Sequence, residues 1–205
     1  MSFTDRLLAR AAALQLPLEG VDVSRLQRYA DLLLHWNARI NLTSLPLAGW
    51  PDATLDRLFL EPIAAAPLVA SARGTWIDLG SGGGSPAIPL AVTLEGMTLT
   101  MTESRGKKAA FLREAIRSLS LPGARVVGPF EELLADPPAT VQLISCRAVS
   151  PSDILAVANH ALADNGQLLF LGAEPLASLG RLTLIQSHRF HGSLASVLMA
   201  KPIQA

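Results

Sequence analysis

The residues of this chain best suited to chemistry lie in one short segment, residues 76–86, which reads WIDLGSGGGSP. An apolar, strand-like run leads into Asp78 and then into glycines from Gly80 to Gly84. Glycine lets the backbone turn tightly and approach a ligand where a side chain would collide. Pro86 suits the first turn of a helix, and the apolar residues after it predict one. Strand, glycine loop and helix start together predict a binding corner for a nucleotide-like ligand.

The spacing of the glycines distinguishes between two kinds of ligand. The dinucleotide fingerprint G-x-G-x-x-G needs a third glycine where Ser85 stands. An acid two residues before Gly80, followed by Gly80 and Gly82, instead resembles the first motif of S-adenosylmethionine-dependent methyltransferases. The resemblance implies S-adenosyl-L-methionine as cofactor, bound by Asp78, Gly80 and Gly82. Nearby carboxylates favour its sulfonium cation electrostatically.

A second acid occurs where a residue that binds the ribose of the cofactor is expected. Residues 97–103 alternate as a strand does and end in Glu103, about 20 residues beyond the glycines. We therefore predict that Glu103 binds the cofactor. The alternative, that residues 80–84 form only a flexible loop, is weakened by this second acid.

The composition predicts a globular protein and argues against several classes. Of 205 residues, 50% are hydrophobic and 17% are charged, so a large core can form and global disorder is excluded. No apolar run reaches the ~18 residues of a membrane span, and the early Asp5 and Arg6 do not suit a secretory leader. A single cysteine, Cys146, favours the reducing cytoplasm. The formal net charge is zero, so any RNA must be bound by a local patch.

The elements that must position these residues alternate between strand and helix from residue 75 onward. Strand-like runs cover residues 75–79, 97–103, 125–128, 141–146, 167–171, 181–187 and 193–200. Helical stretches separate the first five, notably residues 105–119 and 152–162. This alternation predicts an α/β fold with a mostly parallel sheet covered on both faces. The last two runs are too close for a crossover helix and should form a hairpin with an antiparallel last strand. The result is a seven-stranded, Rossmann-like fold of the methyltransferase type.

The N-terminal part is predicted to be helical. Leu26, Tyr29, Leu33, Trp36 and Ile40 follow one another at helical spacing and form an apolar face. Residues 54–69 also predict a helix, with Pro62 as a kink or boundary. We expect one domain over residues 1–205, with a helical extension over residues 1–70 and the Rossmann-like core over residues 71–205.

Ligands of such sheets bind beyond the carboxyl ends of the strands. After the third strand, Phe130 is expected either to lie against the adenine ring of the cofactor, beside Glu131, or to belong to the core. At the fourth end, Arg147 interrupts an apolar neighbourhood and needs a partner. That partner is a ligand carboxylate, a nucleic-acid phosphate or a structural acid.

Three other signals are interpreted as structural. The run 136–138 resembles the Asp-Pro-Pro motif of amino-group methyltransferases, but it precedes the fourth strand and predicts a turn. Cys146 has no general base beside it and is expected to be a buried thiol. The four histidines show no metal-ligand spacing, so no metal site is predicted.

Four segments in order resemble the GidB/RsmG family, bacterial methyltransferases that act on ring nitrogen 7 of a guanine in small-subunit (16S) ribosomal RNA. They are residues 35–44, residues 78–89, residues 103–112 and residues 146–148. The similarity runs from about residue 20 to residue 175 and implies the family's fold, cofactor and RNA substrate. The residues that fall on the family's cofactor-contacting positions are Gly80, Ser85, Phe130, Glu131 and Arg147.

The chain departs from the family at positions expected to face RNA. Arg57-Leu58, Gly172-Ala173 and Leu194-Ala195 stand where the family commonly has basic pairs. Three hypotheses therefore stay open: an RNA methyltransferase, a small-molecule methyltransferase on the same fold, and a cofactor-binding module without methyl transfer.

The chemistry implied by the family needs few catalytic groups. Ring nitrogen 7 of guanine carries a lone pair and no proton, so alignment and exclusion of water are the main tasks. Arg147 is our candidate for the catalytic residue near the reacting centre. Lys107, Lys108 and Arg57 are predicted to bind RNA, while Arg113 and Arg117 better suit a solvated helix face. We expect a cytoplasmic monomer that acts on the small ribosomal subunit and does not bind a membrane.

Overall fold

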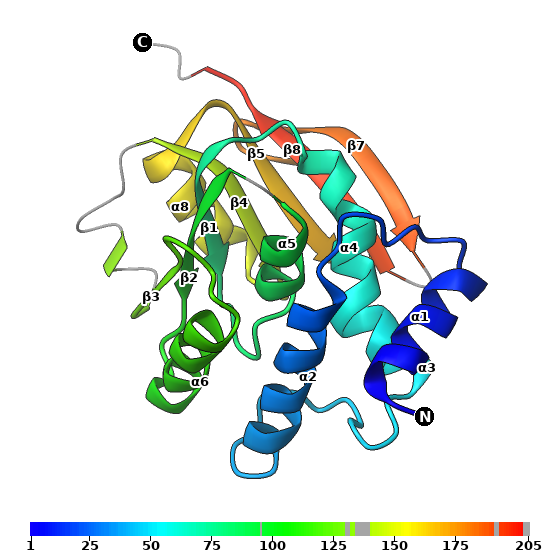
Figure 1. The fold of residues 1–205 in the computed structure, drawn as a ribbon. Helices are drawn as coiled ribbons and strands as arrows, with labels where there is room; N and C mark the ends of the chain where they lie inside the picture. The colour runs from blue at the N-terminus through cyan, green and yellow to red at the C-terminus, as the bar shows by residue number, and fades with distance from the viewer. Residues whose placement is uncertain (95, 130–131, 134–139, 191–192, 203–205) are drawn as a thin grey trace.

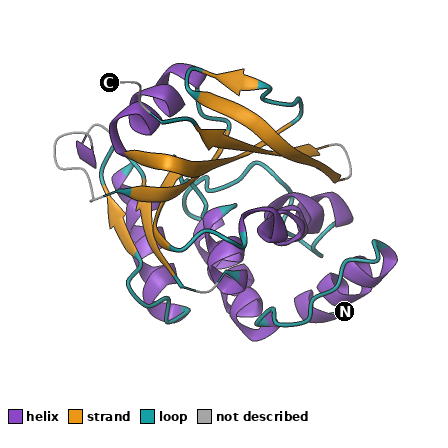
Figure 2. Cartoon of the chain, turned by 90° about the horizontal axis from the view of Figure 1, so that it is seen from above, coloured by secondary structure: helices purple, strands orange, loops and turns teal. Residues whose placement is uncertain are grey.

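The central strands are buried on both faces, as a parallel sheet between two layers of helices requires. The last four residues of β1 (Gly74–Leu79) are all buried, as are four successive residues of β4 (Val141–Arg147). The computed structural model describes residues 1–94, 96–129, 132–133, 140–190 and 193–202. Helices lie on both sides of the sheet, which is seen from above in Figure 2.

The described strands form one eight-stranded sheet in the order β3-β2-β1-β4-β5-β8-β7-β6. Besides β1 and β4, they are β2 (Met97–Thr102), β3 (Arg125–Val127), β5 (Leu162–Gly172), β6 (Ser178–Leu179), β7 (Leu182–Phe190) and β8 (Ser193–Ala200). Strands β3, β2, β1, β4 and β5 are parallel, and β8 is antiparallel to both β5 and β7. The predicted methyltransferase-type sheet and its terminal hairpin are confirmed. The eighth strand, β6, is a two-residue edge pairing that the sequence pattern did not reveal.

The helical elements are α1 (Phe3–Ala13), α2 (Val23–Asn37), α3 (Asp52–Leu55), η1 (Asp56–Leu60), α4 (Glu61–Ala65), η2 (Ala66–Val69), α5 (Ala87–Thr93), α6 (Gly106–Ser118) and α8 (Pro151–Ala161). Among the described residues, no helix is long and apolar enough to cross a membrane. The predicted strand 167–171 was too short, because β5 already begins at Leu162, directly after α8.

Alternate residues of the strands enter two different cores, one on each face of the sheet. Trp76 and Leu143 point into the larger core, which also contains residues of the N-terminal helices, α5 and α6. Their neighbours Ile77 and Ile144 point into the smaller core, which α8 covers. This alternation follows from the two-residue repeat of a strand. The N-terminal helices therefore pack onto one face of the sheet as part of its main core.

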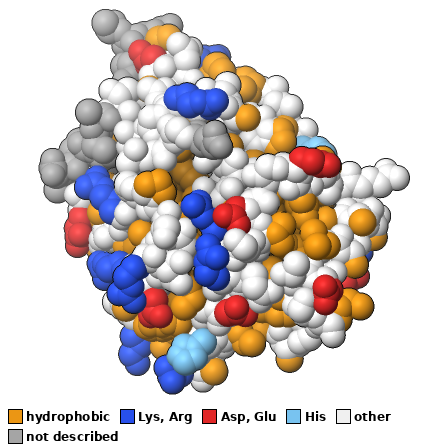
Figure 3. Space-filling view, viewed as in Figure 1, with side chains coloured by type: hydrophobic (Ala, Val, Ile, Leu, Met, Phe, Trp, Pro, Cys, Tyr) orange, Lys and Arg blue, Asp and Glu red, His pale blue; other side chains and the backbone are white. Residues whose placement is uncertain are grey.

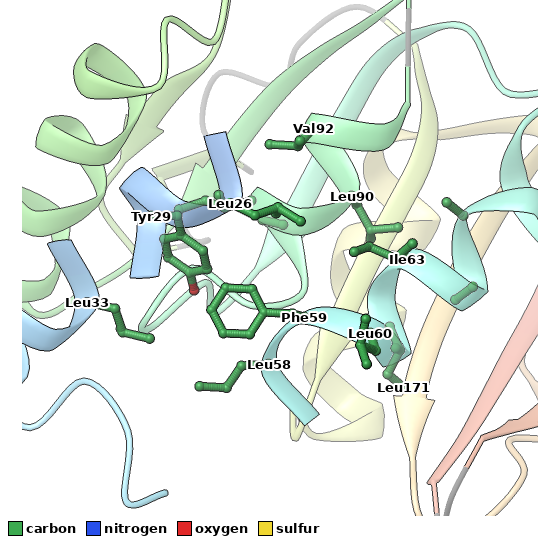
Figure 4. Packing of buried hydrophobic residues seen from close by; sticks show 14 of the residues in the cluster. Leu26, Tyr29, Leu33, Leu58, Phe59, Leu60, Ile63, Leu90, Val92 and Leu171 are labelled. Atoms are coloured by element: carbon green, nitrogen blue, oxygen red, sulfur yellow. The ribbon is translucent and has the colours of Figure 1, made fainter. Parts of the chain in front are cut away.

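The N-terminal helices differ from the prediction at the end of α2 and agree with it at Pro62. Helix α2 ends at Asn37, so Ile40 lies beyond it, although Leu26, Tyr29 and Leu33 are buried along one face as expected. Pro62 lies at a boundary, as predicted: the π-helix η1 ends at Leu60, and α4 begins at Glu61 with Pro62 in its first turn. Proline lacks an N–H and crowds the preceding turn, and a wider π turn accommodates both effects. Figure 4 shows Tyr29 of α2 beside Phe59 of η1, with ring centroids 5.4 Å apart.

Candidate active site

The glycine loop after β1 has the left-handed backbone that glycine favours. Gly80, Gly82 and Gly84 have φ angles of 66°, 53° and 93°. Gly80 N donates to Thr102 Oγ1 over 2.9 Å, and Ser81 N donates to the carbonyl of Thr102 over 2.8 Å. These bonds fasten the loop to the tip of β2. The sequence-predicted glycines thus form a tight turn at the carboxyl edge of the sheet.

Asp78 lies beneath this loop and is completely buried. Ser81 Oγ donates to its Oδ2 over 2.6 Å, and Ser145 Oγ donates to its Oδ1. Burial raises the pKa of Asp78 to about 6, although the hydrogen bonds from the two serines lower it. We predicted that Asp78 binds the cofactor; in the structure its carboxylate lies beneath the loop and accepts hydrogen bonds from the two serines. Ser145 was not predicted, because a serine inside a strand gives no functional signal.

Glu103 joins the glycine loop to the start of α6. Its Oε2 accepts from Gly82 N over 3.0 Å, and its Oε1 accepts from Arg105 N over 2.7 Å. The side chain is half-buried beside the loop, as the spacing of the two acids predicted. A carboxylate held by two backbone N–H groups still has lone pairs for hydroxyl groups of a ligand.

Arg147 at the end of β4 turns toward the N-terminal helices. Its Nη1 donates to the carbonyl of Arg57 over 2.9 Å. Its Nη2 lies 2.9 Å from Oε2 of Glu61, close enough for an ion pair but not aligned for a hydrogen bond. Burial lowers the pKa of Arg147 to about 10, against the opposing effect of Glu61. Of the partners that the sequence left open for Arg147, the structure shows a structural acid.

Glu61 is a buried acid near the site that the sequence analysis missed. Its side chain is 1% exposed and also pairs with Arg57, whose Nη1 lies 3.1 Å from Oε2. The buried carboxylate of Glu61 therefore forms ion pairs with two guanidinium groups. The available signal was a lone acid within the apolar run of residues 58–66.

Helix α2 and residues 35–44, the first segment that resembles the GidB/RsmG family, support the glycine loop from the N-terminal side. Tyr29 Oη donates to the carbonyl of Gly83 over 2.7 Å. Asn37 Oδ1 accepts from Leu42 N and Thr43 N over 2.9 and 3.0 Å, which turns the chain after α2. A Cβ atom on Gly83 would lie 3.0 Å from the carbonyl oxygen of Leu42. The signature is therefore a packing motif that fits the N-terminal helices to the loop.

The other predicted residues lie in different surroundings. Ser85 is half-buried, and within the described part of the chain its Oγ has no hydrogen-bond partner. Lys107 is exposed and Lys108 half-buried in the first turn of α6, where Figure 3 shows Lys and Arg side chains gathered. Cys146 is buried, as expected, and burial raises the pKa of its thiol, which disfavours the reactive thiolate. Phe130 and Glu131, like the run 136–138, lie outside the described residues.

No group of three metal-ligating side chains occurs among the residues that the structure describes. What the described residues bring together is the glycine loop, Asp78 and Glu103. Arg147 and Arg57 form a second group around Glu61 at the neighbouring strand end.

The buried position of Asp78 has a measurable consequence for stability. Its pKa is about 6 in the folded protein and near its ordinary value of 3.8 in the unfolded chain. Between these values only the folded protein binds the proton, so the contribution of Asp78 to stability is complete below pH 3.8 and is lost as the pH rises through 6. At about 1.4 kcal/mol per pKa unit the change is about 3 kcal/mol.

We therefore expect the stability difference between the wild type and Asp78→Asn to change by about 2.5 kcal/mol between pH 4 and pH 7, in favour of the wild type at low pH. Denaturant unfolding of both proteins across this range measures it. Parallel pH profiles for the two proteins would contradict the assignment.

A family model and individual relatives all identify the same protein family. The family model described as rRNA small subunit methyltransferase G matches residues 22–180. The protein named ribosomal RNA small subunit methyltransferase G from Xanthomonas euvesicatoria is 41% identical over 167 residues, which cover 80% of this chain and 76% of that protein. The protein of the same name from Stenotrophomonas maltophilia is 38% identical over 158 residues, covering 77% and 72%.

Solved structures share the fold at low sequence identity. The ribosomal protein L11 methylase of Lactobacillus delbrueckii superposes with a TM-score of 0.54 at 15% identity, covering 69% of this chain and 77% of that one. MtNAS in complex with MTA and tNA superposes with a TM-score of 0.59 at 11% identity, covering 89% and 75%.

Proposed function

Because this chain belongs to the rRNA small subunit methyltransferase G family, we propose that it transfers a methyl group from S-adenosyl-L-methionine to a guanine of small-subunit ribosomal RNA, at ring nitrogen 7. The observation that carries the proposal is the glycine loop, which Asp78 supports from below and Glu103 from the side, in a chain with this family's signature. The alternatives of a small-molecule methyltransferase and a non-enzymatic module have no comparable support.

The residues around the loop fit the proposed cofactor. An added Cβ would lie 3.7 Å from the carbonyl oxygen of Gly80 at Gly82 and 3.5 Å from Cγ2 of Val149 at Gly80, so neither position is crowded by the protein. Glu103 has free lone pairs for ribose hydroxyls, and Ser85 Oγ is a buried hydroxyl without a partner in the described chain. Gly80, Gly82, Ser85 and Glu103 would hold the cofactor, which supplies an electrophilic methyl group. Asp78 acts through Ser81 and the loop, and its negative charge adds a favourable field for a sulfonium cation.

In this reaction the residues of the chain align the guanine nitrogen with the methyl group. Guanine nitrogen 7 has a lone pair and no proton, so no general base is needed, and the described residues of the site contain no obvious one. We propose that Arg147 is a positioning residue instead of a direct catalyst. Through Glu61 and the carbonyl of Arg57 it fixes the N-terminal helices against the strand tips. Lys107 and Lys108 are proposed to contact RNA phosphates. We also propose that the protein acts as a monomer in the cytoplasm.

The test uses small ribosomal subunits from a strain that lacks the corresponding methyltransferase. Incubation with the protein and methyl-labelled S-adenosyl-L-methionine should label the RNA, and mass spectrometry of the digested RNA should show 7-methylguanosine. Subunits that already carry the methyl group should accept no label. Label absent from the RNA, with cofactor binding demonstrated by calorimetry, would refute the proposed function.

A further inference from the structure

A line of buried hydrogen bonds connects the middle of β1 to the glycine loop. Trp76 Nε1 donates to Ser145 Oγ over 2.9 Å, and Ser145 Oγ donates to Oδ1 of Asp78. Ser81 Oγ, in the glycine loop, donates to Oδ2 of Asp78 over 2.6 Å. These four side chains, which we call the buried polar network, are each at most 2% exposed. The network joins the loop to β1 and β4.

The pairing of β1 with β4 brings these side chains together. Asp78 is the partner of Ser145 in the parallel register, and Trp76 precedes Asp78 by two residues, so the three share one face of the sheet. This face carries the larger core, to which Trp76 belongs. Figure 1 shows β1 in the middle of the sheet, between β2 and β4. The network is therefore enclosed by the sheet and the helices that cover it.

The direction of each hydrogen bond follows from the chemistry of the groups. An indole N–H can only donate, and an ionised carboxylate can only accept. Ser145 Oγ accepts from Trp76, so its single hydroxyl proton is left for Asp78. Trp76 thus orients the hydroxyl group of Ser145, and Ser145 orients the carboxylate of Asp78.

The loop end of the network is also fastened by its backbone. Ser81 N donates to the carbonyl of Thr102 over 2.8 Å, and the carbonyl of Ser81 accepts from Gly84 N over 2.7 Å. A displacement of Ser81 would therefore move the whole glycine turn, including Gly82, whose N–H donates to Glu103.

The stability of the fold alone does not account for the network. Burial raises the pKa of Asp78 to about 6, so its ionised carboxylate opposes folding at neutral pH. Apolar side chains of similar volume often replace buried charged groups without loss of stability. An ionised Asp78 beneath the loop does, however, attract a cation bound at the loop, and a sulfonium group is such a cation.

We propose that Ser145 and Trp76 are positioning residues for the cofactor: they hold the carboxylate of Asp78, and through Ser81 the glycine loop, in the arrangement that receives the cationic methyl donor. The inference rests on the proposed function, which supplies the identity of the cofactor. It gives a role in cofactor binding to two strand residues that act through Asp78.

The first experiment removes the hydroxyl group of Ser145. Ser145→Ala should weaken the binding of S-adenosyl-L-methionine about tenfold at pH 7, the effect of losing a hydrogen bond to a charged group. The difference should narrow toward pH 5, where Asp78 is mostly protonated in both proteins. The midpoint of the pH dependence should be higher in Ser145→Ala, because the hydrogen bond from Ser145 lowers the pKa of Asp78. Ser145→Thr keeps a hydroxyl group and should bind within about threefold of the wild type.

The other titratable groups that interact with Asp78 keep their charge between pH 5 and pH 8. Burial raises the pKa of Tyr29 on α2 and of Cys146 on β4, so both stay neutral. The pKa of Arg147 is about 10, so it stays positive. A pH-dependent difference between the wild type and Ser145→Ala is therefore assigned to Asp78.

Isothermal calorimetry across this pH range measures the affinities. Ser196→Ala removes an equally buried hydroxyl group from β8 and should change neither the affinity nor its pH dependence. An unchanged affinity in Ser145→Ala, or the same loss at every pH, would overturn the inference and leave the proposed function intact. A wild type that does not bind S-adenosyl-L-methionine would instead refute the proposed function, and the inference with it.

The second experiment follows the indole N–H of Trp76 by NMR in isotope-labelled protein. Its resonance should shift between pH 5 and pH 8 as Asp78 titrates, because Ser145 links the two groups. The pH-dependent shift should disappear in Asp78→Asn and in Ser145→Ala. A Trp76 resonance that does not respond to pH in the wild type would overturn the role assigned to Trp76.

Discussion

Replacing Glu61 with glutamine is expected to lower the free energy of unfolding by about 3–5 kcal/mol. This is the usual effect of removing one partner of a buried ion pair. The Glu61 side chain is 1% exposed and lies 2.9 Å from Nη2 of Arg147 and 3.1 Å from Nη1 of Arg57. Without the carboxylate, two like charges face each other, and the guanidinium group of Arg147 is left buried without an acid. The loss should therefore be far larger than that of an ordinary surface substitution.

Urea denaturation followed by circular dichroism measures this loss. Glu19→Gln makes the same chemical change at an exposed position and should shift stability by less than about 0.5 kcal/mol. A cycle with Arg147→Met provides a second check, because Glu61→Gln should cost much less once Arg147 is absent. A Glu61→Gln protein within about 1 kcal/mol of the wild type would show that the ion pair has no structural role.

Replacing Gly84 with alanine is expected to damage both stability and cofactor binding. Gly84 has a φ of 93°, and an added Cβ would lie 2.5 Å from Cδ1 of Ile88 and 3.2 Å from the hydroxyl of Tyr29. The left-handed backbone and the crowding together should cost about 2–4 kcal/mol. Tyr29 also holds the carbonyl of Gly83, so its displacement moves the loop. We expect the affinity for S-adenosyl-L-methionine to fall at least about tenfold.

A matched control separates backbone strain from crowding. Gly20 has a φ of 78°, but nothing lies within 4 Å of an added Cβ. Gly20→Ala should therefore cost only about 1 kcal/mol and leave cofactor affinity unchanged. Denaturant unfolding and isothermal calorimetry measure the two effects. Equal stability losses in both variants, with normal cofactor affinity in Gly84→Ala, would mean that the loop tolerates a side chain.

Much of the fold could be predicted from the sequence, because the signals are local. The alternation of strands and helices, the terminal hairpin and the apolar face of Leu26, Tyr29 and Leu33 depend on residues close in the chain. The glycine turn is also local, since Gly80, Gly82 and Gly84 occupy backbone conformations that disfavour other residues. The bounds of elements were predicted less well where tertiary contacts compete with local signals, as at the end of α2 and at the start of β5.

The sequence by itself therefore determined the sheet, the glycine loop and the pair of acids at the tips of β1 and β2. Only the tertiary structure decided how these side chains are used. Asp78 points under the loop to Ser81 and Ser145, and Arg147 pairs with Glu61 across 86 residues of chain. The physical reason is that a charged residue's position along a strand does not determine its partner. The polar groups that neutralise its charge come from distant elements. Such partners follow from packing, which joins residues that sequence spacing keeps apart.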